Sequence, residues 1–234
     1  MNLVLSADNN FAQHLAVTIC SILENRQESY RVIINILDGG INDENKDKIR
    51  RLVAGHEDAQ VVFCKIDENH FDNLPKLRGS LATYYRLLMS EILPPDVDKV
   101  IYLDCDIVVN LDIKELYDID ITNYFLGAVE EKQDENMSNE YKKKRVGIFG
   151  SGKYFNAGVL LINLRKWREV DISKKLLEFA TQNYHKLFFW DQDVLNYVLQ
   201  NKVFFLSNKF NYVVDDYSEN NLDNKIIHYA GAIK

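Results

Sequence analysis

Short apolar runs alternate with helical patterns through the first third of the chain, and this alternation most constrains its fold. Residues 3–5, 32–37 and 61–64 are apolar runs of the length expected for buried strands. Between them, apolar residues recur at helical spacing over residues 11–22, and residues 42–55 have the pattern of a polar helix. Strands that alternate with helices are joined by right-handed crossovers, which favour a largely parallel sheet. The sequence therefore predicts an α/β fold.

The rest of the chain continues this pattern without a linker, an internal repeat or a low-complexity stretch. Residues 130–152 are polar and basic with no clear period, so we expect a flap there. At 234 residues, of which 47% are hydrophobic, the chain is long enough to form a sizeable core, and we expect one domain over residues 1–234. We expect helices at residues 84–93, 172–184 and 191–199, and strands at residues 100–103, 125–129, 159–162, 203–206 and 226–229.

Two acidic residues, Asp104 and Asp106, directly follow the apolar run 100–103. Residues two apart in an extended chain point to the same side, so both carboxylates can converge on one cation while Cys105 points away. Open α/β sheets bind their ligands at the carboxyl ends of strands, where this pair is expected to lie. Taken alone, the pair is better explained as an ordinary solvated strand end, because acids are common on protein surfaces.

The net charge of −7 argues against unaided binding of nucleic acid, which requires concentrated Lys and Arg. Residues 142–145 form a local basic cluster, which we interpret as a solvated helix face or loop. The N-terminus becomes polar too early for a signal peptide, and no run is long enough to span a membrane. Cys20, Cys64 and Cys105 lack metal-ligand spacing and suit a reducing compartment. These features predict a cytoplasmic protein.

Six segments, the acidic strand end among them, form a recognisable pattern. They are Ser-Ala-Asp-Asn-Asn at 6–10, Thr-Tyr-Tyr-Arg-Leu at 83–87, the acidic strand end at 100–106, Tyr-Phe-Asn-Ala-Gly-Val-Leu-Leu-Ile-Asn-Leu at 154–164, Trp-Asp-Gln-Asp at 190–193, and His-Tyr-Ala-Gly-Ala-Ile-Lys at 228–234. In this order, and across nearly the whole chain, they resemble the family 8 glycosyltransferases. The similarity is strongest to bacterial lipopolysaccharide and lipooligosaccharide glucosyl- and galactosyltransferases.

The resemblance implies a GT-A fold: a Rossmann-like, mostly parallel twisted sheet flanked by helices, with a small secondary antiparallel sheet. It also implies transfer of a hexose, glucose or galactose, from a UDP-sugar to a glycan or glycolipid acceptor, with retention at the anomeric carbon. A divalent metal, Mn2+ with Mg2+ as the alternative, is expected on the diphosphate. Members of the family continue beyond the position of Lys234 with a basic, aromatic tail that contacts the inner face of the membrane. We therefore expect this chain either to be a shortened form or to lack membrane attachment.

The resemblance assigns one set of residues to the nucleotide and the metal. Imidazole among the ligands favours Mn2+ over Mg2+. Read without the resemblance, His228 could be a core histidine satisfied by the backbone, and Asp8 could be only a helix cap. The implied set is Ala7 and Asp8 toward the uracil, Asn10 toward the ribose, Asp104, Asp106 and His228 as metal ligands, Cys105 within the acidic turn, and Gly231 and Lys234 on the diphosphate.

A second implied set concerns the sugar and the acceptor. It comprises Arg86 toward the donor sugar or diphosphate, and Asn156, Ala157, Asp191 and Gln192 along the sugar and acceptor pocket. Asp191 is the candidate nucleophile for a double displacement, with Gln192 as an electrostatic alternative, and a front-face reaction needs neither. The acidic residue that the family carries after the strand at 125–129 falls on Glu130 or Glu131, and the sequence does not choose between them.

Two other functions remain open at this point. Residues 104–108 also resemble the nucleophile loop of haloacid-dehalogenase-type phosphatases, and residues 213–216 could supply that family's late acids. That loop normally follows the first strand of its domain, however, whereas three expected strands precede it here. The second alternative is a non-catalytic protein of the same fold that binds a sugar nucleotide or a glycan.

Overall fold

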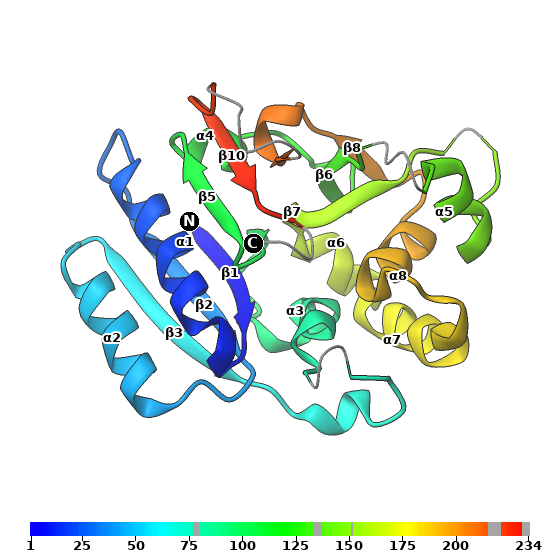
Figure 1. Cartoon of the computed structure of the whole chain (residues 1–234), viewed down its shortest axis with the longest axis horizontal. Coiled ribbons are helices and arrows are strands. Elements are labelled where there is room, and N and C mark those ends of the chain that lie inside the picture. The colour runs from blue at the N-terminus through cyan, green and yellow to red at the C-terminus, as the bar shows by residue number, and fades with distance from the viewer. Residues whose placement is uncertain (77–79, 133–136, 151, 215–220, 231–234) are drawn as a thin grey trace.

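A seven-stranded sheet forms the centre of the computed structural model, which describes residues 1–76, 80–132, 137–150, 152–214 and 221–230 (Figure 1). All neighbouring strands are parallel except β7, which is antiparallel to β4 and β6. The predicted α/β fold and mostly parallel sheet are therefore confirmed. In sheet order the strands are β3 (Ala59–Lys65), β2 (Val32–Asp38), β1 (Asn2–Ala7), β4 (Lys99–Leu103), β7 (Phe155–Asn163), β6 (Leu126–Glu130) and β8 (Val203–Phe205).

A second, small sheet consists of β5 (Ile107–Asn110), β10 (Lys225–His228) and β9 (Tyr212–Val213). The pair β5/β10 is antiparallel, as expected for the secondary sheet, whereas β9 runs parallel to β10. Because only three residues separate the end of β4 from the start of β5, the acidic turn at 104–106 joins the two sheets. The carboxyl end of β4 in the main sheet and the start of β5 in the small sheet therefore meet at this turn.

Helices cover both faces of the main sheet, and each face has its own apolar core. The helices α1, α2 and α4 lie on one face together with β5, and η3, α3, α6, α7 and α8 lie on the other. The α-helices are α1 (Ala12–Glu24), α2 (Asp43–Ala54), α3 (Met89–Ile92), α4 (Lys114–Tyr117), α5 (Asn139–Val146), α6 (Leu164–Glu169), α7 (Ile172–Asn183) and α8 (Trp190–Val198). The 3-10 helices are η1 (Asn9–Phe11), η2 (Glu68–Phe71), η3 (Ala82–Leu88), η4 (Tyr184–Lys186) and η5 (Asn208–Phe210).

The continuous apolar character of the central strands follows from this two-sided burial. On β4, Val100 and Tyr102 enter one core while Ile101 and Leu103 enter the other, and all four are almost fully buried. Successive strand residues point to opposite faces, so a strand covered on both faces must be apolar at every position. The acids at 104 and 106 follow immediately, where this burial ends.

The expected helix over 84–93 is wrong in detail. The segment begins earlier as the 3-10 helix η3 and becomes α-helical only over the single turn of α3. Tyr84 to Leu88 are five consecutive buried residues, because the segment lies between the sheet and the helices α7 and α8. A segment that is buried on all sides has no apolar stripe on one face, and prediction of a helix from periodicity relies on such a stripe.

The polar segment 130–152 also differs from expectation, because it contains the regular helix α5. Ser138 caps this helix by accepting a hydrogen bond from the Tyr141 backbone N–H at 3.2 Å, and Gly147 ends it in the left-handed conformation with φ of 89°. Two of its basic residues, Lys142 and Lys143, are buried rather than solvated. The interpretation of this cluster as a solvated face is therefore wrong for these two side chains.

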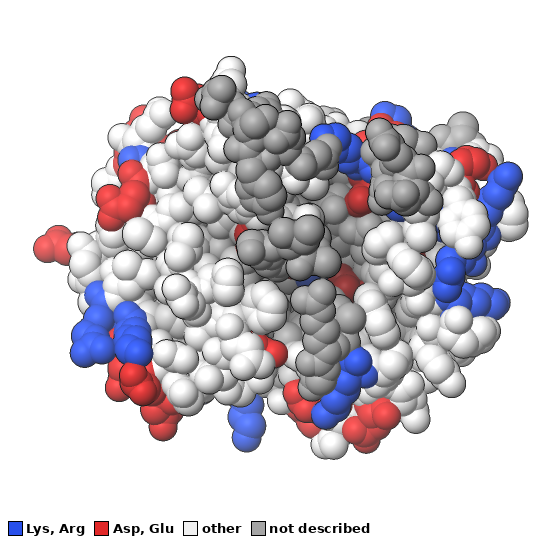
Figure 2. Space-filling model, viewed as in Figure 1, with Lys and Arg blue, Asp and Glu red and all other residues white. Residues whose placement is uncertain are grey.

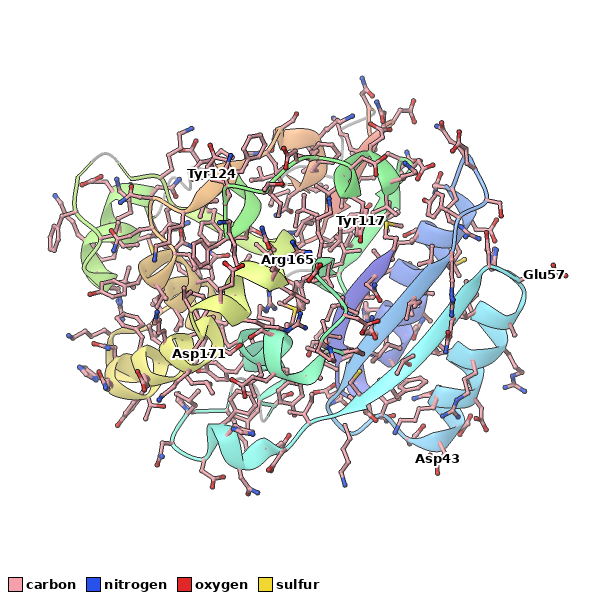
Figure 3. The ribbon with its side chains drawn as sticks, turned by 180° about the vertical axis from the view of Figure 1, so that it is seen from behind. Asp43, Glu57, Tyr117, Tyr124, Arg165 and Asp171 are labelled. Carbon is pink, nitrogen blue, oxygen red and sulfur yellow. The ribbon has the colours of Figure 1, made fainter. Side chains whose placement is uncertain are left out.

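The surface carries no broad basic area on the face shown in Figure 2, where Lys and Arg gather mainly over α5 at the right and near α2 at the left. Figure 3 shows the reverse side, with Asp43 and Glu57 projecting outward near the two ends of α2. Within the described residues, no helix is both long and apolar enough to cross a bilayer.

Candidate functional site

Three side chains that are distant in the sequence meet at the junction of the two sheets. One ligand atom each from Asp104, Asp106 and His228 lies within 4.8 Å of the other two. His228 ends β10, and the β5/β10 register places it opposite Ile107, next to Asp106. The His228 Nε2 atom is 3.3 Å from Asp106 Oδ1. Two carboxylates and one imidazole form a donor set that suits a divalent cation such as Mn2+.

Backbone and hydroxyl contacts hold the acidic turn in place. The Asp104 N–H donates to Gly158 O on β7 at 2.8 Å, and the Cys105 thiol lies 3.1 Å from Ser6 O on β1. The Thr18 hydroxyl of α1 is 2.9 Å from Cys105 O. Cys105 thus points away from the acids, as the alternation of an extended chain predicts, and its role is to anchor the turn to the neighbouring strand.

Gly158 packs directly beneath the His228 ring. A Cβ atom added at this glycine would lie 2.3 Å from His228 Cε1 and 2.8 Å from Nδ1, closer than any real contact. The same residue accepts the Asp104 N–H through its carbonyl oxygen. A glycine at this position therefore lets strand β7 approach both the imidazole and the acidic turn.

Arg86 joins the acidic turn to the start of α8. Its guanidinium pairs with Asp104 Oδ1 at 2.7 Å and with Asp191 Oδ2 at 3.0 Å, and it lies over the Tyr102 ring at 4.2 Å. Burial disfavours the charged guanidinium, but the two carboxylates outweigh this effect, so the pKa of Arg86 lies above its ordinary value. Arg86 is only 6% exposed, so it is a buried residue of the site and not a surface residue.

Asp191 is buried at 5% exposure and both of its oxygens are engaged. Thr83 donates to Oδ1, and Arg86 pairs with Oδ2. Burial raises the pKa of Asp191 to about 6, and the Arg86 charge opposes this rise. A carboxyl group whose pKa is raised by burial and influenced by a specific charged partner is a frequent feature of functional sites.

A cavity of about 510 Å³ opens between the end of β1, the segment at η3 and the acidic turn. Asp8 lies at its β1 end, where Oδ1 accepts the N–H groups of Asn10 at 2.9 Å and Phe11 at 3.3 Å. The structure thus shows the cap role of Asp8, and Oδ2 takes no part in it. The predicted residues that line this cavity are Ala7, Asp8, Asn10, Arg86, Asp104, Cys105 and Asp106.

The other predicted pocket residues meet around Glu131. The Asn156 side-chain amide donates to Glu131 Oε2 at 2.9 Å, and the Gln192 amide donates to the same oxygen at 3.1 Å. Gln192 Oε1 in turn accepts the Ala157 N–H at 2.9 Å. Glu130, by contrast, is an exposed residue paired with Lys153. Of the two acids that the sequence left open, Glu131 is the one that adjoins the site.

The sequence analysis assigned no site role to three residues that contribute to this arrangement. Lys142 is buried against Glu131, with its Nζ atom 3.3 Å from Oε1, although the basic cluster read as a surface feature. Thr83 binds Asp191 and lies in the matched segment at 83–87, whereas Asn211, which binds His228, carries no local signal beyond its own polarity. Gly231 and Lys234 lie outside the described residues.

Comparison with known proteins assigns the chain to a family. A family model described as glycosyl transferase family 8 matches residues 2–234. A putative glycosyltransferase of Haemophilus influenzae is 39% identical over 92% of this chain, which spans only 64% of that relative's length. A lipopolysaccharide 1,3-galactosyltransferase of Salmonella typhimurium and a lipopolysaccharide 1,2-glucosyltransferase of Escherichia coli K12 are 30% and 27% identical. Each of these two alignments covers 100% of this chain and 72% of the relative.

A solved structure has the same fold. The galactosyltransferase LgtC, in complex with donor and acceptor sugar analogues, superimposes with a TM-score of 0.84 at 29% identity, covering 99% of this chain and 87% of LgtC. The resemblance inferred from the six motifs is thus confirmed along the whole chain. This chain belongs to glycosyl transferase family 8 and has the GT-A architecture of LgtC.

Proposed function

We propose that this protein transfers a hexose, glucose or galactose, from a UDP-sugar to a glycan or glycolipid acceptor, with retention at the anomeric carbon. The observation that carries the proposal is the cavity with Asp8 at one end and the acids Asp104 and Asp106 at the other. Its volume of about 510 Å³ lies within the usual range for small-molecule sites. Family membership and the likeness to LgtC support the same reaction class.

The base would bind at the β1 end of the cavity. Asp8 can accept the uracil N–H through Oδ2, since its cap contacts use only Oδ1. Cytosine has no equivalent N–H, so this contact would select uracil. Ala7 would face the same ring, and Asn10 would face the ribose.

The diphosphate would lie at the acidic turn, with a divalent metal held by Asp104, Asp106 and His228. These three donors fit Mn2+ better than Mg2+, because imidazole is among them. When bound, the metal would stabilise negative charge that develops on the departing UDP. Lys234 would add a positive charge to the same phosphates, and Gly231 would allow a close approach of the backbone.

The hexose and the acceptor would lie between the acidic turn and α8, lined by Arg86, Asn156, Ala157, Asp191 and Gln192. A second cavity of about 360 Å³ is lined in part by Asn156 and Leu206, and we assign the acceptor to this side. Glucose and galactose differ in the orientation of one hydroxyl group, which a few contacts in such a pocket would distinguish.

Front-face attack is the mechanism that the geometry favours. A nucleophilic Asp191 would need a free oxygen facing the anomeric carbon, but this carboxylate is buried and held by Thr83 and Arg86. Gln192 is also held at both ends of its amide. In the front-face route the leaving phosphate oxygen takes the acceptor proton, so no dedicated base is needed. Positioning by these fixed groups would then supply much of the rate enhancement.

Release of UDP from UDP-glucose and from UDP-galactose, with Mn2+ and without acceptor, tests the proposal. We expect the wild type to hydrolyse one of the two donors slowly and Asp106→Ala to lose this activity. Binding of UDP without any release would instead indicate the non-catalytic alternative. Hydrolysis of a generic phosphate ester that beryllium fluoride blocks would indicate the phosphatase. The family match favours glycosyl transfer over that activity.

A further inference from the structure

Asn211 is a buried residue that connects His228 to the pocket around Glu131. It follows η5 and is 2% exposed. Its Nδ2 atom lies 2.8 Å from Asn156 Oδ1, and its Oδ1 atom lies 2.9 Å from His228 Nδ1. Asparagine oxygen and nitrogen atoms look alike in shape, so this orientation has to be justified from the groups at the ends of the network.

The far end of the network has only one consistent orientation. The backbone N–H of Gly158 can only donate, and it lies 2.9 Å from Asn156 Oδ1. The Glu131 carboxylate, when ionised, can only accept, and it lies 2.9 Å from Asn156 Nδ2. Reversing the Asn156 amide would place a donor against the Gly158 N–H and an acceptor against the carboxylate. Asn156 is therefore fixed at both ends.

This orientation is passed on to the next amide. Asn156 presents its oxygen to Asn211, so Asn211 must turn its NH2 group toward Asn156 and its oxygen toward His228. A carbonyl oxygen can only accept, so the His228 Nδ1 atom must carry a hydrogen. In a neutral imidazole this leaves the lone pair on Nε2, which faces Asp106 Oδ1 at 3.3 Å. Two acceptors then face each other, and a cation between them resolves the conflict.

We propose that Asn211 is a positioning residue that sets the Nδ1–H tautomer of His228 and thereby prepares Nε2 to bind the metal. The orientation originates at the Gly158 N–H and at Glu131 and passes through Asn156 and Asn211. Without Asn211, the neutral imidazole can place its hydrogen on Nε2 and donate it to Asp106, a tautomer that cannot bind a metal through Nε2. This proposal rests on the metal site of the proposed function.

The tautomer itself can be measured without metal, nucleotide or turnover. Long-range 1H–15N correlation spectra of the metal-free protein, above the pH at which His228 loses its charge, assign which ring nitrogen carries hydrogen. We expect Nδ1–H in the wild type and a majority of Nε2–H in Asn211→Leu. An Nε2–H wild type, or an Asn211→Leu variant that retains Nδ1–H, would overturn the proposal. A failed UDP-sugar assay would leave this measurement unaffected, so the two proposals fail separately.

Affinity for Mn2+ gives the second readout, measured by electron paramagnetic resonance of free Mn2+ with and without UDP. We expect Asn211→Leu to weaken binding by about 10- to 100-fold, the range found when a partner of a ligating histidine is removed. Unchanged Mn2+ affinity in Asn211→Leu would contradict the proposal.

Asn35→Leu provides a matched control. Asn35 is another buried asparagine, 4% exposed, whose amide donates to Leu3 O within the sheet and does not contact the site. The same substitution there should lower stability while leaving the His228 tautomer and the Mn2+ affinity unchanged. If Asn211→Leu fails to fold, an Nε2–H wild type still overturns the proposal.

Discussion

The two sides of the candidate metal site are held by different kinds of interaction. On the side of Asp104 the contacts are ionic, since Arg86 pairs with Asp104 and with the buried Asp191. On the side of His228 the contacts run through the neutral amides of Asn211 and Asn156. A guanidinium can only donate, so it fixes the position of its partners. An amide has a donor end and an acceptor end, so it also fixes the protonation of its neighbour.

The largest effect is expected from breaking the ionic side with Arg86→Met. This change leaves the buried Asp191 without its countercharge, which typically costs about 3–5 kcal/mol. Urea denaturation should show the loss as a lower unfolding midpoint. Arg50→Met is the control, because Arg50 and Asp47 form an exposed pair whose removal should cost no more than about 1 kcal/mol. Equal losses in the two variants would mean that burial of the Arg86 cluster does not matter.

Removing Asp104 or Asp106 tests the candidate metal site itself, which lies between the ionic side and the amide side. We expect Asp106→Ala to lower kcat/KM for the donor by about 100- to 1000-fold, or about 2.7–4 kcal/mol of transition-state stabilisation, with the fold intact. Asp104→Ala should lose as much activity and also stability, because Asp104 pairs with Arg86. Circular dichroism melting separates the two variants. Normal turnover by either one would refute the metal assignment.

The His228 side of the site, which is held by the amides, can be perturbed by a substitution that removes no polar atom. A methyl group in Gly158→Ala would overlap the His228 ring, so the imidazole and strand β7 cannot both keep their positions. We expect Mn2+ affinity to fall about 10- to 100-fold, equivalent to about 1.4–2.7 kcal/mol. Gly55→Ala, at a position where a Cβ atom would meet only Leu52 O at 3.4 Å, should bind Mn2+ normally. Full affinity in Gly158→Ala would mean that the imidazole position is not critical.

The smallest effect concerns the pH dependence of the ionic side. The pKa of Asp191 rises from 3.8 to about 6 on folding, so the native state binds the extra proton. Its contribution to stability is therefore complete below pH 3.8 and is lost as the pH rises through about 6. Between pH 5 and pH 7 the unfolding free energy should fall by about 1 kcal/mol from this group. Urea midpoints of the wild type and Asp191→Asn should show this slope only in the wild type, and an identical slope in both would exclude Asp191 as its source.

Local patterns were sufficient for the fold and for part of the site. Alternation of strands and helices predicted the parallel sheet, and spacing by two residues placed Asp104 and Asp106 on one side of the chain. These local patterns failed where a side chain is buried although its residue type is usually exposed. Lys142 looked like a surface residue, yet its side chain is buried against Glu131. No pattern distinguished Glu131 from Glu130, because adjacent residues differ only in the face to which they point.

The sequence by itself determined the order of the elements, the apolar strands that need cover on both faces, and the acidic turn that follows one of them. These properties depend on neighbours along the chain, through which periodicity acts. The tertiary structure brings His228 against the acids, a contact that the family resemblance implies but no local pattern does, and it alone decided that Asn211 meets His228. Such contacts depend on the register of β10 against β5 and on the close approach that Gly158 permits. As a result, the donor and acceptor ends of one residue are set by residues that lie far away in the sequence.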